Sequence, residues 1–334
     1  MIDTIRLSHG SGRGLDELLR DIILPCLGKD ALGPLEDAAV FPVPEGRIAF
    51  TTDAFVVNPL EFPGGDIGKL AACGTLNDLA MMGAVPHSLS VALILEEGLD
   101  TALLRRVLGT LVGECHKAGA VIRCGDTKVV DRGKADGIFI ATSGIGSVPA
   151  GRTISVANAK PGDAVIVSGT IGHHGIAILA ARKGLHFAST AISDCACLHG
   201  LVEALLKAAP GTRSLRDATR GGCAAVLNEM ALASGTTIVL REERIPIAPE
   251  IASASAFLGL DPLHIANEGR FIAVVPAAEA ERALAALRAC EQGRGAAIIG
   301  TVGEKTRLPV VMETAIGGSR MVDVPSGELL PRIC

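Results

Sequence analysis

The sequence contains no tryptophan and no tyrosine, and phenylalanine occurs at only 8 of its 334 positions. Many proteins that bind single-stranded nucleic acid stack its bases on aromatic side chains, and many protein interfaces are anchored by such residues. The scarcity of aromatic residues argues against both. The net charge of -5 comes from interspersed acids and bases without a basic stripe, so we expect no nucleic-acid partner.

Long apolar runs are missing as well. No run reaches the length that spans a bilayer. The N-terminus lacks a basic segment followed by an apolar one, so we expect no secretory signal. The nine cysteines are scattered and odd in number. We therefore expect a cytoplasmic protein with reduced thiols and no membrane contact.

Cys195-Ala196-Cys197 is the only closely spaced cysteine pair. A zinc site of the common type would need a second pair at a matching spacing. Packing within a helix over 195–208 is therefore favoured over a metal site.

The residues that are abundant predict a folded chain with two domains. Hydrophobic residues make up 49% and charged residues 20% of the chain, which is unlike a disordered protein. Apolar periodicity predicts helices near 15–27, 66–82, 100–118, 176–182, 195–208, 222–233, 248–258 and 277–290. It predicts strands near 47–57, 88–95, 120–124, 137–145, 164–167, 237–240, 271–275, 296–302 and 309–312. The turn residues at 159–163 are the clearest boundary between two α/β or α+β regions.

Five aspartates stand at the end of an apolar segment or in a glycine-rich turn. They are Asp37, Asp53, Asp78, Asp126 and Asp217. Any one of them alone is explained by a solvated turn or a helix cap. Taken together, they could hold Mg²⁺ through oxygen ligands, with phosphate oxygens completing the coordination. Which aspartate would hold which ion stays open.

Further candidates for a nucleotide site lie beside these aspartates. Lys128 follows Asp126 by two residues and could offset phosphate charge. Asp217-Ala218-Thr219-Arg220-Gly221-Gly222 stands at a predicted helix entrance, where N–H groups and a guanidinium suit phosphate. The opening His9-Gly10-Ser11-Gly12-Arg13-Gly14 would let the backbone approach a phosphate, although a flexible terminus explains it equally well.

Two residues could act on a substrate directly. Glu268, in Ala266-Asn267-Glu268-Gly269 before a strand, is a candidate base, although a turn residue is the simpler reading. Cys334 carries a thiol on a C-terminal tether that Pro331 stiffens. Taken alone, an ordinary residue on a frayed terminus is the simpler reading. It is not a prenylation site, because that cysteine stands fourth from the end.

The order of these motifs resembles the superfamily of ATP-dependent enzymes that includes aminoimidazole ribonucleotide synthetase, selenophosphate synthetase and thiamine-monophosphate kinase. Within it, the chain is similar to the HypE family of carbamoyl dehydratases, essentially from end to end. The residues that carry the resemblance are His9-Gly10-Ser11-Gly12, Glu36-Asp37-Ala38-Ala39, Thr52-Asp53, Asn77-Asp78-Leu79-Ala80-Met81-Met82-Gly83-Ala84, Gly125-Asp126-Thr127-Lys128-Val129-Val130, Asp217-Ala218-Thr219-Arg220-Gly221-Gly222, Ala266-Asn267-Glu268-Gly269 and Pro331-Arg332-Ile333-Cys334. Two departures stand out: Arg13 interrupts an expected glycine pair, and His173 replaces an expected acid.

The resemblance implies a definite reaction. Cys334 would receive a carbamoyl group from the carbamoyltransferase HypF, and ATP would drive its dehydration to a thiocyanate. The cyano group would pass through the HypC–HypD complex toward the iron of a [NiFe]-hydrogenase. Glu268 is the first candidate for the base that removes the nitrogen protons, and Lys128 is the second; a lysine base would need a pKa lowered by burial.

The resemblance also implies the ligands and the organisation of the chain. ATP with Mg²⁺ would be bound by His9, Gly10, Asp37, Asp53, Asn77, Asp78, Asp126, Thr127, Lys128, Asp217, Thr219 and Arg220. The N-terminal segment would cover 1–35, the ATP-binding domain 36–155, the C-terminal domain 156–322 and a flexible tail 323–334. The sheet of the ATP-binding domain would pair with its copy in a homodimer, with ATP near the dimer contact.

Two other readings remain. The chain could be another ATP-dependent member of the superfamily, such as a selenophosphate synthetase or a small-molecule kinase, whose activity would survive loss of Cys334. It could instead be a non-catalytic adaptor or metal chaperone using Cys334, Cys195, Cys197 and histidines. That protein would bind stoichiometric metal and turn over no ATP.

Overall fold

The computed structural model describes residues 3–10, 12–27, 46–184, 191–324 and 332–334. The chain divides into two compact units. The N-terminal unit comprises Met1–Leu79, Ala84–Ala150 and Cys334, and the C-terminal unit comprises Ala80–Gly83 and Gly151–Ile333. Each unit combines helices with a sheet, so the predicted two-domain α/β class is confirmed.

A four-stranded sheet forms the centre of the N-terminal unit. Its strands are β1 (Arg47–Phe55), β6 (Ile138–Val148), β4 (Val85–Glu96) and β5 (Val121–Val130), in that spatial order. Only β4 and β5 are parallel. A short hairpin of β2 (Glu61–Phe62) and β3 (Gly65–Asp66) leads into the first long helix.

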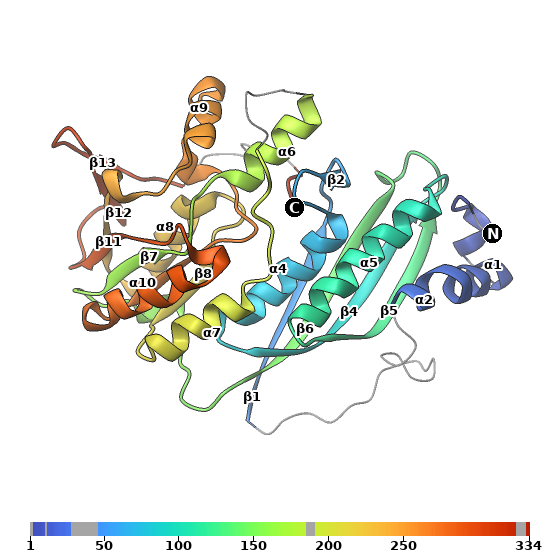
Figure 1. The fold of residues 1–334 in the computed structure, drawn as a ribbon, viewed down its shortest axis with the longest axis horizontal. Coiled ribbons are helices and arrows are strands. Elements are labelled where there is room, and N and C mark those ends of the chain that lie inside the picture. Colours follow the sequence, from blue (N-terminus) through green and yellow to red (C-terminus); the bar gives the residue numbers. More distant parts are fainter. Residues whose placement is uncertain (1–2, 11, 28–45, 185–190, 325–331) are drawn as a thin grey trace. The chain divides into compact units, whose positions relative to one another are not determined.

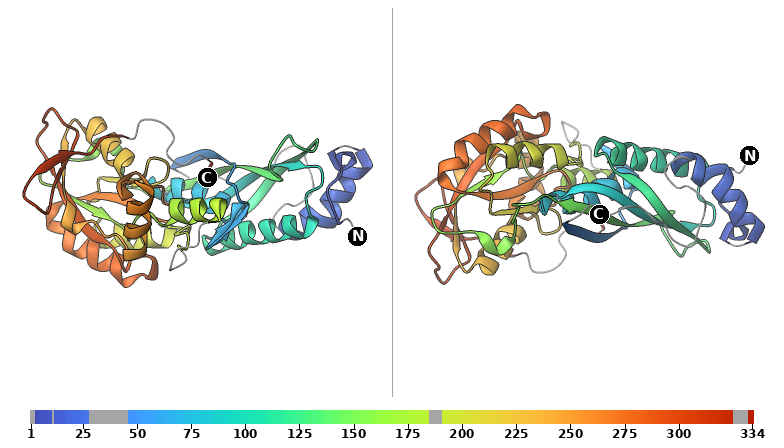
Figure 2. Two further views of the ribbon diagram at one scale, coloured as in Figure 1. Left: turned by 90° about the horizontal axis from the view of Figure 1, so that it is seen from above. Right: turned by 90° about the horizontal axis from the view of Figure 1, so that it is seen from below.

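Helices α4 (Ile67–Met81) and α5 (Thr101–Lys117) cover one face of this sheet (Figures 1 and 2). The apolar residues of α5 recur at helical spacing, from Leu104 through Leu108 to Cys115, and are buried. Asp100 caps the helix by accepting from the backbone N–H of Ala102 at 2.9 Å.

No described helix covers the other face of the N-terminal sheet, here called the open face (Figures 1 and 2). Successive residues of a strand point to opposite faces, so Ile48 and Phe50 of β1 share this face with Ile94 of β4. In the chain alone they are 49%, 69% and 41% exposed. A sheet face this apolar normally packs against something.

Helical turns precede this sheet in the chain. They are η1 (Leu7–Gly10), α1 (Gly12–Leu18), η2 (Leu19–Ile23) and α2 (Leu24–Leu27). The predicted helix over 15–27 is thus present, with a π-helical turn in its middle. η1 lies against β5, and α2 against α5.

A seven-stranded sheet forms the centre of the C-terminal unit. Its strands, in spatial order, are β13 (Ser319–Met321), β12 (Val310–Glu313), β9 (Thr237–Arg241), β11 (Ala297–Gly303), β7 (Ala164–Val167), β10 (Phe271–Val275) and β8 (Ser214–Asp217). All neighbours are antiparallel except β9 and β12.

Both faces of this sheet are buried, which explains why its central strands read as unbroken apolar runs. In β7, Ile166 packs with α7 (His199–Ala208) and α10 (Ala280–Ala289), whereas Val165 and Val167 pack with α8 (Gly222–Ser234). Phe271 and Ile272 of β10 divide between the two faces in the same way.

The remaining elements of the C-terminal unit lie around this core. Helices α6 (His173–Lys183) and α9 (Pro249–Leu258) contribute Ile176 and Ile251 to a smaller apolar cluster. Short 3-10 turns are η3 (Val156–Asn158), η4 (Glu242–Arg244), η5 (Pro262–His264), η6 (Ala277–Glu279) and η7 (Glu291–Gly293). No described helix is both long and apolar enough to cross a bilayer.

Some sequence-based predictions of elements are wrong. Asp126 does not follow a strand but lies inside β5, where Gly125 comes so close to the backbone of Val91 that a Cβ would stand 2.6 Å from its oxygen. Residues 195–198 are not helical, because contacts with the loop around Glu268 hold that segment. The short strands β8 and β13 were not predicted, since their polar residues carry no clear alternation.

The contact between α4 and α5 gives a matched stability prediction. A Cβ on Gly68 of α4 would stand 2.0 Å from the backbone oxygen of Val107, whereas Gly109 of α5 has no neighbour within 4 Å. Gly68→Ala should lower the free energy of unfolding by about 1–3 kcal/mol through overpacking. Gly109→Ala should raise it by about 0.5–1 kcal/mol, because alanine favours helix. Chemical denaturation of both variants checks this, and equal stability would contradict the close helix contact.

Candidate active site

Two of the predicted aspartates lie beneath the helices of the N-terminal unit, and threonine hydroxyls orient both. Thr75 Oγ1 donates to Asp53 Oδ2 at 3.0 Å, and Thr51 Oγ1 donates to Asp78 Oδ2 at 2.7 Å. Asp53 belongs to β1 and Asp78 to α4. The predicted Asn77 is buried beside Asp78 on the same helix.

A buried relay supports Asp53. The Thr75 and Thr142 hydroxyls are 2.5 Å apart, and both residues are fully buried. Since a carboxylate oxygen accepts, Thr75 gives its single hydrogen to Asp53, and Thr142 then donates to Thr75. Gly144 makes room for this contact, because a Cβ there would stand 2.7 Å from the Thr75 methyl group. The position of the Asp53 carboxylate is therefore set by the core.

Asp126 and Lys128 lie on the other face of the same sheet. Their partners across β4 are Ala92 and Ile94, which point to the open face. Lys128 Nζ is 2.8 Å from both Asp126 oxygens, and each side chain is 65% exposed. Bonding to Lys128 lowers the pKa of Asp126. An exposed pair of this kind contributes only about 0–1 kcal/mol, so Lys128 can exchange this partner for a phosphate at little cost.

The remaining N-terminal candidates lie near β5 or outside the described residues. The Thr127 N–H donates to Asp126 Oδ1 at 2.8 Å. η1 brings His9 and Gly10 to β5, where a Cβ on Gly10 would stand 3.2 Å from that of Val129. Asp37 falls outside the described residues.

The N-terminal unit of one chain thus divides its predicted ligands between two faces of a sheet. Asp53 and Asp78 lie on the helix-covered face, and Asp126 and Lys128 on the open face. Among the residues described, no group of three His, Cys, Asp or Glu side chains is placed to hold a metal ion. Magnesium commonly uses one or two carboxylates with water and substrate phosphates, so the oriented Asp53 and Asp78 suit it as ligands.

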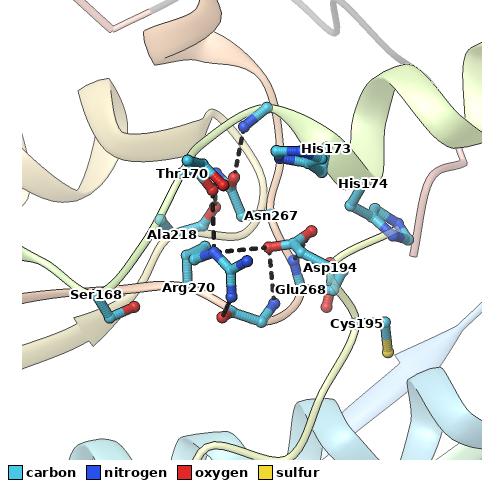
Figure 3. Close-up of polar contacts among 12 residues, drawn as sticks. Ser168, Thr170, His173, His174, Asp194, Cys195, Ala218, Asn267, Glu268 and Arg270 are labelled. Carbon is cyan, nitrogen blue, oxygen red and sulfur yellow. Dashed lines mark hydrogen bonds and ion pairs between the residues drawn. The ribbon is translucent and has the colours of Figure 1, made fainter. Parts of the chain in front are cut away.

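In the C-terminal unit, Glu268 lies in a loop whose backbone is held by Asp194 (Figure 3). The Asp194 carboxylate, 1% exposed, accepts from the backbone N–H groups of Glu268 at 3.4 Å and Gly269 at 3.2 Å. Arg270 Nε lies 3.9 Å from the same carboxylate. A Cβ on Gly269 would stand 1.8 Å from the Asp194 backbone oxygen, so only glycine fits there. Glu268 itself is 3% exposed.

Asn267 and Arg270 join this loop to its neighbours. Asn267 Oδ1 accepts from the Gly172 N–H at 2.7 Å, and its amide nitrogen donates to the carbonyls of Ala218 and Ile265. Arg270 Nε donates to the Thr170 carbonyl at 3.0 Å. Segments distant in the chain therefore fix the position of Glu268 together.

Two histidines begin helix α6 next to this loop (Figure 3). Burial lowers the pKa of His173, and the Asp194 carboxylate partly opposes this effect. Burial also lowers the pKa of His174, which is fully enclosed. His173, which departs from the expected acid, lies 4.0 Å from the Glu250 carboxylate.

The predicted phosphate segment leads into a helix as expected. Asp217 is buried at the end of β8, Arg220 is exposed, and α8 begins at Gly222. Gly222 has φ +60°, and a Cβ there would stand 2.5 Å from the Leu263 carbonyl oxygen. Thr219, half-buried, lies between these residues.

At the end of the chain, Cys334 is half-buried, and its backbone oxygen accepts from the Val56 N–H at 3.1 Å in the N-terminal unit. Pro331 falls outside the described residues. All nine cysteines are described and free of disulfides. Cys195 is buried in the loop that Asp194 holds, not in a helix.

Sequence reasoning gave Asp194, Arg270 and His174 no role, and named His173 only as a departure from an expected acid. The adjacent histidines after a glycine were a usable signal, because two imidazoles at a helix start are uncommon. Asp194 gave none, since its partners follow more than seventy positions later.

The buried His174 makes stability depend on pH. Its folded pKa is below the ordinary 6.5, so the unfolded chain binds more protons just below that value. The free energy of unfolding should therefore fall as pH drops below about 6.5. His174→Gln removes the titrating group and should flatten this decline between roughly pH 7 and pH 5. Chemical denaturation at a series of pH values compares the wild type, His174→Gln and the control His116→Gln, in which an exposed histidine is replaced. If the free energy of unfolding has the same pH dependence in all three proteins, His174 does not cause the decline.

Comparison with known proteins agrees with this arrangement. The AIR synthase related protein N-terminal domain matches residues 35–148, and the AIR synthase related protein C-terminal domain matches residues 160–313. The carbamoyl dehydratase HypE of Azotobacter vinelandii is 49% identical over 332 residues, covering 99% of this chain and 97% of that protein.

Solved structures give the same result. A hydrogenase maturation protein HypE in complex with ATP has a TM-score of 0.95 and 44% identity, covering 99% of this chain and 100% of that one. A chain from a HypE–HypF complex has a TM-score of 0.82 and 47% identity, covering 85% and 92%. The chain belongs to the HypE family of carbamoyl dehydratases, within the AIR synthase related proteins.

Proposed function

We propose that the chain dehydrates an S-carbamoyl group on Cys334 to a thiocyanate at the expense of ATP, and so supplies the cyanide ligand for the iron of [NiFe]-hydrogenase. The observation that carries this proposal is the near full-length similarity to carbamoyl dehydratases, combined with a buried glutamate on a rigid loop and a thiol at residue 334. A selenophosphate synthetase or a small-molecule kinase would not need both the buried glutamate and the thiol at residue 334.

The reaction balances without a redox partner. The thiolate of Cys334 accepts the carbamoyl group, and the thiocarbamate oxygen then attacks the γ-phosphate of ATP, releasing ADP. Cleavage of the C–O bond releases phosphate, and loss of both nitrogen protons leaves the S–C≡N group. Phosphorylation is needed because an unactivated carbonyl oxygen is a poor leaving group.

Glu268 is the proposed base for the nitrogen protons. A general base must be held in reach of its proton, and the contacts of Asp194 and Asn267 fix the backbone on which Glu268 stands. Lys128 is the less suitable candidate, because it is exposed and paired with Asp126.

ATP binding is proposed from the aspartates and from the related structure that contains ATP. Asp53 and Asp78 are the best-placed ligands for Mg²⁺, since threonines orient both. The ion would neutralise phosphate charge during transfer. Asp37, Asp126, Asp217, Asn77, Thr127, Thr219, Arg220, His9 and Gly10 complete the proposed nucleotide site. The use of ATP and free thiols suits the reducing cytoplasm.

A second copy of the chain is the proposed partner of the open sheet face. That face exposes Ile48, Phe50 and Ile94 beside Asp126 and Lys128. Pairing two such faces would bury the apolar residues. Because Asp126 and Lys128 belong to the same face, we propose that they lie at this contact between the two copies.

HypF is the proposed donor of the carbamoyl group, because a related HypE chain was solved in complex with HypF. The HypC–HypD complex is the proposed acceptor of the cyano group. A non-catalytic metal chaperone is the alternative, and it would turn over no ATP.

The proposed nucleotide ligands on the two faces of the sheet are tested by two matched variants. Asp78→Asn and Asp126→Asn should each abolish ATP hydrolysis while the fold survives, because each removes a carboxylate charge without changing the size of the side chain. ATPase assays and denaturation curves of both variants measure this; hydrolysis at the wild-type rate in both would contradict the assignment.

The role of Glu268 is tested by intact mass after incubation with the carbamoyltransferase, carbamoyl phosphate and ATP. The wild-type chain should carry the cyano adduct, and Glu268→Gln should accumulate the carbamoyl adduct, because only deprotonation is impaired. Cys334→Ala is the control and should carry neither while still binding ATP. An adduct on another cysteine, or normal thiocyanate formation by Glu268→Gln, would contradict these assignments.

A further inference from the structure

A buried chain of hydrogen bonds joins helix α6 to the backbone just before Cys334. His174 Nε2 lies 2.6 Å from the Ile333 carbonyl oxygen, and Nδ1 lies 2.8 Å from Ser193 Oγ (Figure 3 shows His174). A carbonyl only accepts, so Nε2 carries the hydrogen and Nδ1 accepts from the Ser193 hydroxyl. Ser193 Oγ in turn accepts from the Cys195 N–H at 3.1 Å. One neutral tautomer thus satisfies the whole chain.

A second residue of α6 binds the preceding carbonyl. Arg182 Nη2 donates to the Arg332 carbonyl oxygen at 2.5 Å. Residues separated by about two turns lie near the same side of a helix, so His174 and Arg182 can reach consecutive peptide groups. The Ile333 side chain is also buried.

The backbone at Arg332 needs these contacts. Its φ of +54° is the one positive value among the described residues other than glycine. Side chains disfavour this left-handed region, and such a conformation persists only when the surroundings impose it. The docked conformation of residues 332–334 therefore depends on the hydrogen bonds from His174 and Arg182 of α6.

We propose that His174 and Arg182 form a latch that holds the segment 332–334 through the carbonyls of Arg332 and Ile333. The latch sets the fraction of chains in which Cys334 is docked. It contacts backbone and not the thiol, so it acts alike on the free and the carbamoylated cysteine. Both residues are positioning residues, and their role in the reaction rests on the proposed function.

Docking is measured first without any partner, from the rate at which iodoacetamide alkylates Cys334, followed by mass spectrometry of the C-terminal peptide. His174→Leu removes the donor and should raise this rate roughly five- to tenfold. Arg182→Ala should raise it in the same direction, while Lys183→Ala, an exposed neighbour on α6, should leave it unchanged. His174→Gln keeps an N–H donor and should restore a rate near that of the wild type.

The same variants are then compared in single-turnover dehydration of the carbamoylated chain. The rate should fall in proportion to the docked fraction, which the alkylation rate of Cys334 gives by comparison with the unfolded chain, while carbamoylation of Cys334 is retained. Alkylation of the buried Cys223 reports global unfolding. If alkylation of Cys223 shows that His174→Leu is unfolded, the latch is tested instead by comparing the alkylation rate of Cys334 in Arg182→Ala with that in Lys183→Ala.

Wild-type alkylation rates in both His174→Leu and Arg182→Ala would overturn the latch. A dehydration rate that does not follow the docked fraction would overturn its role in the reaction. Raised alkylation in a protein whose wild type forms no thiocyanate would support the latch and refute the proposed function, so the two failures are distinguishable.

Discussion

The geometry of the C-terminal unit depends on one buried carboxylate. Asp194 accepts the backbone N–H groups of Glu268 and Gly269 and lies beside the Arg270 guanidinium. Removing a carboxylate from water is costly unless hydrogen bonds and an opposite charge replace its hydration. The loop must therefore keep the shape that offers these partners. The backbone of Glu268 is fixed because its own N–H group and that of Gly269 both donate to the Asp194 carboxylate.

In the N-terminal unit, the alternation of side chains along the strands decides where the charged residues lie. A sheet covered on one face only has two distinct surfaces, and strand alternation sends neighbouring residues to opposite ones. Asp53 is fixed from within by Thr75 and Thr142. Asp126 and Lys128 remain exposed, paired loosely with each other. A charge pair this exposed is readily rearranged, which suits the roles proposed for Asp126 and Lys128 in binding a nucleotide and a second chain.

The proposed carrier role of Cys334 sets opposing demands. The cysteine would have to leave its docked position to meet a donor and an acceptor, and return to be processed. Contacts to backbone carbonyls from His174 and Arg182 stabilise docking without engaging the reacting group. Individual hydrogen bonds contribute about 0.5–1.5 kcal/mol, which holds a short segment reversibly.

The amino-acid sequence was sufficient for the fold class, most helices and strands, and the chemical types of the candidate residues, because apolar periodicity and glycine-flanked acidic motifs are local signals. It placed Asp126 in a turn, yet the residue lies inside β5, since close approach of Gly125 to Val91 is a property of the neighbouring strand. Asp194, Arg270 and the pairing of His174 with Ile333 were beyond sequence reasoning, because each depends on segments far apart in the chain. The sequence by itself thus determined which reactive groups the protein possesses. Only the tertiary structure decided which of them face one another, because face, burial and hydrogen-bond partner are set by packing between distant elements.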